Sequence, residues 1–136
     1  MMKDVAHGVH RIEFKDKILT VEAKGPFNEQ QVQNYQAQLQ EVLSEIKGQW
    51  GQLNLLHQDC IFTPQAEREM YQTIKLRKQF GVCAIAVVFV DTARTAIVEQ
   101  QLTRLYRQFN IVHAYFIDTD AALVWLEAQV VISSSD

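Results

Sequence analysis

The sequence predicts an α/β protein with a mostly parallel five-stranded sheet and an antiparallel hairpin at its N-terminal edge, in the order ββαβαβαβα. Two short stretches that alternate between apolar and polar residues begin the chain. Helical periodicity then alternates with short apolar runs, as in successive βαβ units. One of these runs, residues 82–90, is apolar throughout, which is typical of a strand covered by helices on both faces. No linker-like segment interrupts the order, so we expect one domain over residues 1–136.

The composition is that of a globular chain of modest charge. Of the 136 residues, 48% are hydrophobic and 21% are charged, and the formal net charge is -3. Such a chain can bury a large core and is not expected to be disordered. The small negative charge gives no broad cationic field, so we expect no nucleic-acid partner.

The chain ends and the cysteines indicate the compartment. The first residues lack the apolar core of a signal peptide, and no run approaches the ~18 apolar residues of a membrane helix. We therefore expect a cytoplasmic protein with no integral membrane segment, with residues 1–8 and 133–136 flexible. Cys60 and Cys83 are too few for a disulfide framework, and we interpret Cys83 as a small buried hydrophobe.

A hairpin is predicted at the start of the chain. Ile12 and Phe14 alternate with charged residues, and residues 19–24 repeat this alternation. The Asp16-Lys17 step between them is short enough for a two-residue turn, although it lacks an Asn-Gly or Asp-Gly pair. We expect the two strands to pair in antiparallel orientation.

The first helix is predicted to begin after Asn28. Asn28 and Gln31 have the spacing of a capping box, and apolar residues recur at helical spacing until Gly48 supplies a left-handed stop. The opposite face is rich in glutamine and carries little charge. It is either ordinary solvated surface or a surface for contact with another protein, where strongly hydrated charges would be costly to bury.

The second helix is predicted to begin at Pro64, with Thr63 as its N-cap. Its acidic residues come early, and Lys75, Arg77 and Lys78 come near its end. This order complements the helix dipole. We interpret the basic end in this way rather than as an anion-binding patch.

The remaining elements continue the same alternation. Strands are predicted at residues 50–57, 82–90 and 111–117, and helices at residues 93–109 and from residue 119 onward. Residues 82–90 are expected to be the central parallel strand. Residues 130–132 either extend the last helix or dock loosely.

The sequence does not contain a pattern that indicates catalysis or metal binding. GxSxG and GxxxxGK[ST] are both missing, and the spacing of the His and Cys residues does not suit a metal site. We therefore expect no catalytic residues, no bound metal and no cofactor. His113 lies in an apolar strand and is interpreted as a hydrogen-bonded structural histidine.

Parallel α/β sheets bind ligands at the carboxyl ends of their strands, where helices begin. The candidate binding or regulatory residues at this edge are Asp59, Cys60, Thr63, Asp91, Thr92 and Asp118. Asp and Thr are also standard helix caps, so we interpret the Asp and Thr residues mainly as N-caps. The alternative is a small polar site at this edge, or a regulatory hydroxyl at Thr63, where a phosphate would lie at a helix N-terminus.

Three segments resemble the SpoIIAA-like proteins, which are relatives of the STAS domain of anti-sigma-factor antagonists and sulfate transporter tails. Residues 115–126 are similar to the closing strand and the acidic, Ala-rich helix of a bacterial SpoIIAA-like subgroup of small uncharacterised proteins. Residues 62–66 resemble the aromatic-Thr-Pro start of its second helix, and residues 85–91 resemble its buried strand ending in Asp. The resemblance spans about residues 9–126.

The resemblance implies a superhelical β/α sheet, no catalytic apparatus, and a binding or regulatory role in the cytoplasm, often as a dimer. Anti-sigma antagonists also carry a phosphorylatable serine in an Asp-Ser-x-Gly-like loop at the start of the second helix. This chain has Cys60-Ile61-Phe62-Thr63-Pro64 at that place, so the serine switch is not carried over.

Two functions remain open. The first is a non-enzymatic STAS-like module that binds an unidentified protein partner or a second copy of itself. The alternative is a carrier or sensor of a small apolar or amphipathic, lipid-like ligand, because the superhelical sheet also resembles that of CRAL-TRIO domains. Large aromatic side chains belong to a packed core or line a pocket, and they are Trp50, Phe62, Tyr71, Phe80, Tyr106 and Phe109.

Overall fold

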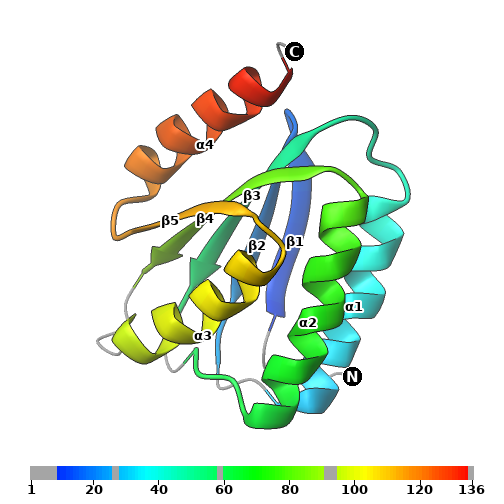
Figure 1. Ribbon diagram of the computed structural model, residues 1–136, viewed down its shortest axis with the longest axis vertical. Coiled ribbons are helices and arrows are strands. Elements are labelled where there is room, and N and C mark those ends of the chain that lie inside the picture. Colours follow the sequence, from blue (N-terminus) through cyan, green and yellow to red (C-terminus); the bar gives the residue numbers. More distant parts are fainter. Residues whose placement is uncertain (1–8, 26–27, 58–59, 91–94, 135–136) are drawn as a thin grey trace.

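The computed structural model of the chain describes residues 9–25, 28–57, 60–90 and 95–134. Within these residues it confirms the predicted fold class, a mixed five-stranded sheet with four helices in the order ββαβαβαβα (Figure 1). The strands are β1 (Val9–Lys15), β2 (Ile18–Ala23), β3 (Trp50–Leu56), β4 (Val82–Phe89) and β5 (Val112–Phe116). The helices are α1 (Glu29–Leu43), α2 (Pro64–Gln79), α3 (Thr95–Gln108) and α4 (Thr119–Ser134).

The strands lie in the sheet in the order in which they occur in the chain, β1-β2-β3-β4-β5. β1 and β2 pair antiparallel, and the other neighbours pair parallel. The hairpin turn is formed by Asp16 and Lys17, whose φ angles are 53° and 65°. A type I′ turn requires positive φ at both of its central residues, so this hairpin adopts that backbone without glycine.

The helices form a layer on each face of the sheet (Figure 1). α1, α2 and α3 share one face, because each right-handed crossover adds the next parallel strand on the same side. α4 follows the last strand and packs on the opposite face, over β3 and β4. At β1 and β2 an ion pair joins Arg11 to the half-buried Glu22.

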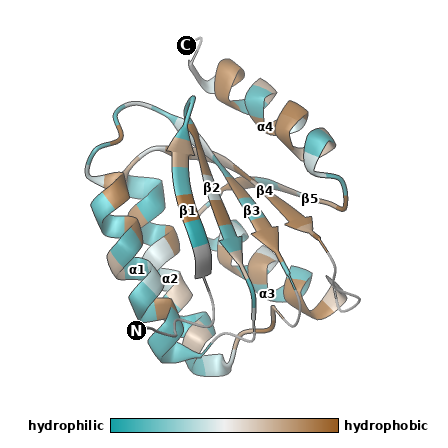
Figure 2. Cartoon of the chain, turned by 180° about the vertical axis from the view of Figure 1, so that it is seen from behind, coloured by the Kyte–Doolittle hydropathy of each residue, from teal (hydrophilic) through white to brown (hydrophobic). Residues whose placement is uncertain are grey.

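Two buried clusters form the core. The larger lies between the sheet and α1, α2 and α3. The smaller joins Ala122, Leu126 and Val130 of α4 to the other face of the sheet. Figure 2 shows largely hydrophobic strands between these layers, while α1 and α2 expose mostly hydrophilic residues. β4 is buried almost throughout, as predicted for a strand covered on both faces, but β3 occupies the middle of the sheet.

The boundaries agree closely with the sequence predictions, with one difference at the C-terminal end and one in β4. α4 continues through Ser134, so residues 130–132 extend it and residues 133–134 belong to the helix. Residues 1–8 and 135–136, which the sequence also predicts to be flexible, lie outside the described residues. Cys83 is half-buried because it falls at a register shift between β3 and β4. In the described parts of the chain, no helix combines the length and the apolar character needed to cross a membrane.

Candidate functional site

Thr63 has the capping role that the sequence predicts. It is the N-cap of α2, in extended conformation, and its Oγ1 accepts a hydrogen bond from the backbone N–H of Ala66 at 3.0 Å. Pro64 follows in the first turn, where its missing N–H would have no helical partner in any case. Because the Thr63 hydroxyl is engaged in this bond, the helix start depends on it.

The other described edge residues also have structural contacts. Asp118 caps α4, since its Oδ1 accepts from the N–H of Asp120 at 3.0 Å and its carbonyl accepts from the N–H of Ala122 at 3.1 Å. Cys60 is buried, and its thiol donates to the carbonyl oxygen of His57. The remaining predicted candidates, Asp59, Asp91 and Thr92, lie outside the described residues.

Thr63 and Asp118 do not belong to one site. They follow β3 and β5, with β4 between these strands, so the two strand ends are about 10 Å apart at the usual strand spacing. Their helices also cover opposite faces of the sheet. Among the described residues, no group of three or more His, Cys, Asp or Glu side chains is placed to hold a metal ion.

A cavity of about 50 Å³ lies between the sheet and the layer of α1, α2 and α3. Its apolar walls are formed by Val21, Val32, Leu56, Phe62, Met70 and Leu102. Its polar lining comes mainly from Tyr35, Asn54, Arg77 and Tyr106. The cavity therefore extends from the carboxyl ends of β2 and β3, close to where α1 and α2 begin, to the last turns of α2 and α3.

Of the six aromatic residues considered for a pocket, Phe62 and Tyr106 line this cavity. Trp50 is instead fully buried, and its Nε1 donates to the carbonyl oxygen of Phe80 at 2.7 Å. Tyr71 and Phe109 pack against each other with ring centroids 4.8 Å apart. Trp50, Tyr71 and Phe109 thus belong to the packed core, and the Phe80 side chain is 38% exposed.

Arg77 is the most unusual residue of the cavity. Its side chain is buried, with 1% of the residue exposed. Its Nε donates to the carbonyl oxygen of Thr73 at 3.2 Å, and its Nη2 donates to the Thr73 hydroxyl at 3.0 Å. The guanidinium carbon lies 5.7 Å from the ring centroid of Tyr35. None of the described carboxylates forms an ion pair with Arg77.

Two hydrogen bonds and one cation–π contact are the compensation that the described residues give the buried guanidinium. Arginine stays charged at any pH that the folded chain tolerates. Burial of an ion costs several kcal/mol even after relaxation of the protein, whereas a cation–π contact returns about 0.5–2 kcal/mol. Arg77 therefore lacks a counter-charge in the described part of the chain.

A chain of polar side chains lies next to Arg77. Gln52 Nε2 donates to Asn54 Oδ1 at 2.6 Å and to the Tyr35 hydroxyl at 3.5 Å. Asn54 Nδ2 in turn donates to the Tyr106 hydroxyl at 3.3 Å. Gln52 Oε1 is buried and is not hydrogen-bonded to any described group. The larger cluster thus contains a polar network in the middle of an otherwise apolar layer.

Burial has a direct effect on the acidity of Tyr106. Desolvation raises the pKa of its hydroxyl well above the ordinary value, and the positive charge of Arg77 lowers it by a smaller amount. The hydroxyl of Tyr106 is therefore a protonated donor at neutral pH. Partial burial likewise raises the pKa of Tyr115, whose hydroxyl lies 2.7 Å from that of Thr103.

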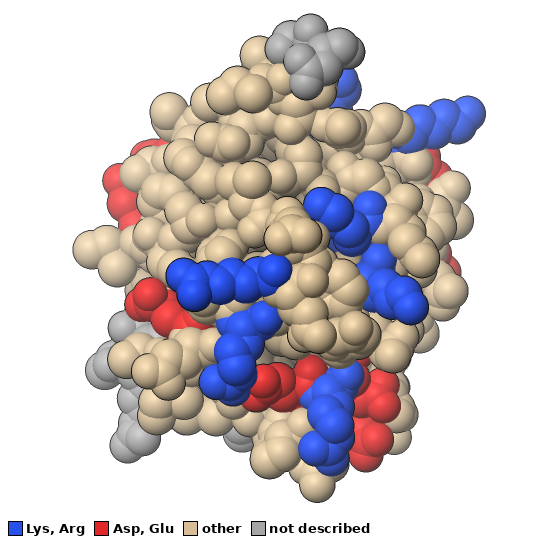
Figure 3. All heavy atoms as spheres, in the orientation of Figure 1, with Lys and Arg blue, Asp and Glu red and all other residues tan. Residues whose placement is uncertain are grey.

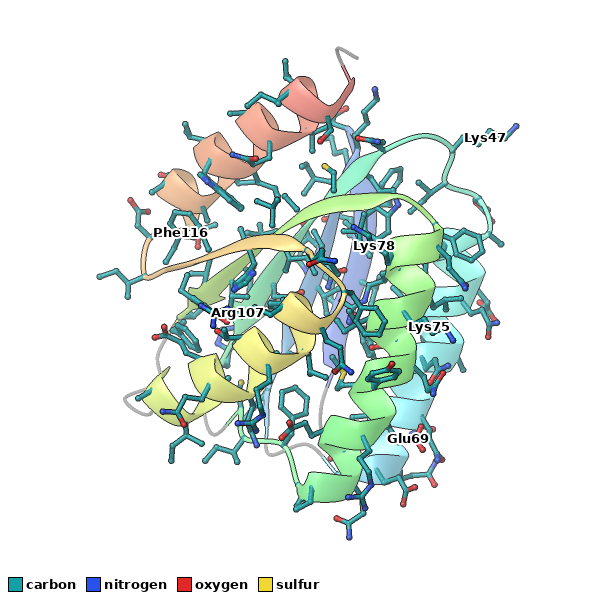
Figure 4. All side chains as sticks on the ribbon, in the orientation of Figure 1. Lys47, Glu69, Lys75, Lys78, Arg107 and Phe116 are labelled. Carbon is teal, nitrogen blue, oxygen red and sulfur yellow. The ribbon has the colours of Figure 1, made fainter. Side chains whose placement is uncertain are left out.

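The sequence did not identify Arg77 as part of a site. Its position in the last turn of α2 agrees with the predicted dipole complementation, but its burial does not follow from that role. Lys75 and Lys78, which Figure 4 labels on the same turns, are exposed. The helical spacing could have indicated this burial. Arg77 lies three residues after the buried Ile74 and seven after the buried Met70, so it shares their side of α2.

Basic side chains are also spread over the outer surface of α2 and α3 (Figure 3). Acidic side chains lie among them, and Arg104 forms a two-pronged ion pair with Glu67 at 3.0 Å. The outer surface of α2 and α3 is therefore a mixture of both charges.

The histidine of β5, His113, has a structural contact, as predicted: its Nδ1 lies 2.9 Å from the carbonyl oxygen of Ile111.

A second candidate surface is the outer side of α4. Val124, Val131 and Ile132 are 68%, 67% and 62% exposed, and Ile117, which precedes the helix, is 86% exposed. Figure 2 shows hydrophobic stretches in alternation with hydrophilic ones along this helix. Exposed apolar side chains that gather on one element mark a contact surface more often than scattered ones do.

No family model, curated protein or solved structure matches the chain. The SpoIIAA-like family therefore remains a prediction from the three sequence segments. The function is inferred from the geometry of the chain itself.

Proposed function

We propose that this chain is a non-enzymatic, SpoIIAA-like binding module of the cytoplasm that acts through protein–protein contact, and that α4 pairs with α4 of a second copy. The observation that carries the proposal is a stripe of small apolar residues on the exposed side of α4. This outer stripe consists of Ala121, Val124, Ala128 and Val131, all of them exposed.

The spacing of the outer stripe suits helix pairing. Its residues follow one another at intervals of three, four and three, which is the spacing of the a and d positions of a coiled coil. Alanine and valine are small, so a second helix can approach closely. The stripe lies opposite the residues by which α4 packs on the sheet, so both contacts are possible at once.

The stripe is also suited to a partner identical to itself. A two-fold interface brings the same patch of both subunits together, so the patch must not repel its own copy. The stripe itself is uncharged, and the two acidic residues of α4, Asp120 and Glu127, lie at its margin. Two copies can therefore bury the stripe against each other without burying like charges at its centre.

The alternative function, carriage of a lipid-like ligand, needs more space than the described core offers. For comparison, an engineered apolar cavity of about 150 Å³ binds benzene, which has six heavy atoms. The cavity near Arg77 is about 50 Å³. An acyl chain would therefore require the helix layer to open, and this difference favours the protein-binding proposal.

The test is the oligomeric state of a variant with a charged stripe. Val124→Glu and Val131→Glu together place two like charges on the stripe and should convert a dimer into a monomer, measured by light scattering during size-exclusion chromatography. Gln33→Glu with Gln40→Glu is the matched control, since it adds the same charges seven residues apart on the exposed side of α1. This control should remain dimeric.

Three results would contradict the proposal. A wild-type chain that stays monomeric at high concentration excludes the second copy. A dimer that survives both α4 substitutions places the contact elsewhere. Loss of the dimer in the α1 variant alone would assign the contact to the glutamine-rich face that the sequence also suggested.

A further inference from the structure

The buried guanidinium of Arg77 points to a ligand. It lines the cavity, it is 1% exposed, and it has no carboxylate partner among the described residues. Its two hydrogen bonds to Thr73 use two of the five N–H groups of the side chain. The remaining N–H groups require acceptors or water at the cavity.

The neighbouring groups add donors rather than acceptors. The hydroxyl of Tyr106 accepts from Asn54 and stays protonated, so its own proton is available. The hydroxyl of Tyr35 accepts from Gln52 in the same way. The unmatched acceptor among the described buried side chains is Gln52 Oε1. An excess of donors around a fixed positive charge favours an anion.

The cavity limits the size of this anion. At least about 10–15 Å³ is needed for each water-sized group, so about 50 Å³ holds at most about three to five heavy atoms. The apolar walls, which include Val32, Leu56, Met70 and Leu102, favour hydrocarbon over a second charged or strongly hydrated group. Phosphate would place oxygen atoms against these apolar walls, which have no hydrogen-bond donors for them.

We infer that this cavity binds a short-chain monocarboxylate, of the size of acetate or propionate. Arg77 holds the carboxylate, because a guanidinium can donate two parallel hydrogen bonds to it. The hydroxyl groups of Tyr35 and Tyr106 are the further donors, and the alkyl end lies against the apolar walls. The site is on the face of the sheet opposite α4, so it does not depend on the proposed function.

The ligand class can be tested on the intact chain by thermal unfolding at constant ionic strength. Sodium propionate should raise the melting temperature by about 5 to 10 °C at a hundredfold excess over its Kd. Propionamide is the matched neutral control, since it has the same size and shape without the charge. Propionamide and sodium chloride should leave the melting temperature unchanged, and sodium phosphate should raise it only by the small amount that its exclusion from the protein surface gives.

The role of Arg77 is tested by two substitutions. Arg77→Met removes the charge but keeps the length of the side chain, and it should melt no lower than wild type without ligand and no longer respond to propionate. Arg77→Lys keeps the charge but loses the paired donors, and it should bind propionate at least about tenfold more weakly. Lys78→Met is the matched control, because this exposed neighbour should keep the wild-type response.

A second measurement identifies the place of binding even if the Arg77 variants fail to fold. Propionate should shift the methyl NMR signals of Met70 and Leu102 in the wild-type chain and leave those of Leu126, in the other core cluster, unchanged. Equal stabilisation by propionamide, phosphate or chloride would overturn the inference. So would the lack of any response to propionate, or shifts confined to other parts of the chain.

Discussion

Leu126 Cδ1 lies 2.8 Å from the position that a Cβ atom would take on Gly51. Gly51 belongs to β3 and Leu126 to α4, and the leucine is completely buried. Val130 Cγ2 is 3.0 Å from the same position. The lack of a side chain at Gly51 therefore allows α4 to pack directly on the backbone of the sheet.

Substitution of Gly51 by alanine should destabilise the chain. The added methyl group would overlap Leu126, so the helix must move or the leucine must change its rotamer. Overpacking of this kind typically costs about 1–3 kcal/mol. Chemical denaturation of G51A followed by circular dichroism should show this loss.

A double-mutant cycle separates overlap from other effects of the alanine. Leu126→Ala alone should cost about 2–5 kcal/mol, because it leaves a void between α4 and the sheet. In the double variant G51A/L126A the new methyl group has room, so the combined loss should be smaller than the sum of the two. Strict additivity would show that Gly51 is required for a reason other than the approach of Leu126.

Thr63→Ala should destabilise the chain by about 1 kcal/mol, because α2 loses its N-cap hydrogen bond to Ala66. Thr63→Ser keeps the hydroxyl and should restore most of this loss. The measurement is the free energy of unfolding of the two variants. A T63A variant as stable as wild type would show that α2 does not need the Thr63 hydroxyl as a cap. This result would support the regulatory alternative for that hydroxyl.

The sequence was sufficient where one local pattern determines one local structure. The Asn28–Gln31 capping box forms as predicted, with Asn28 Oδ1 accepting at 2.9 Å and Gln31 Oε1 accepting at 2.8 Å. The apolar run of β4 likewise became a strand covered on both faces. The order of elements followed from such patterns, and right-handed crossovers then placed three helices on one face.

The sequence was insufficient where tertiary packing determines the environment of a residue. The sequence groups Arg77 with its two lysine neighbours near the end of the helix, and its charge gives no sign that the helix buries it. The Asp16-Lys17 turn lacks the usual glycine, so its positive φ angles could not be predicted. The last helix is apolar on two sides, and only its position on the sheet shows which side is exposed.

The ion pair between Glu67 and Arg104 should contribute little to stability. Its geometry is good, with two oxygens of Glu67 at 3.0 Å from Arg104 Nη2, but the Arg104 side chain is 61% exposed. Exposed pairs are typically worth about 0–1 kcal/mol. Glu67→Gln should therefore change the free energy of unfolding by less than about 1 kcal/mol, and a larger loss would show that the pair fixes α3 against α2.

Alkaline pH should reveal the buried hydroxyl of Tyr106. Burial raises its pKa in the folded chain above the value of about 10 in the unfolded chain. The folded chain therefore keeps a proton that the unfolded chain loses. Stability from this group is complete below about pH 10 and is lost as the pH rises from there toward the folded pKa.

Tyr106→Phe should remove this part of the pH dependence. At neutral pH the variant should be less stable by about 1 kcal/mol, because Asn54 Nδ2 loses its acceptor. Above about pH 10 its free energy of unfolding should fall less steeply than that of wild type, so the two curves converge. Urea denaturation at a series of pH values measures both slopes. Parallel curves would contradict this prediction. They would mean that the Tyr106 hydroxyl ionises as readily in the folded chain as in the unfolded one, despite its complete burial beside Asn54.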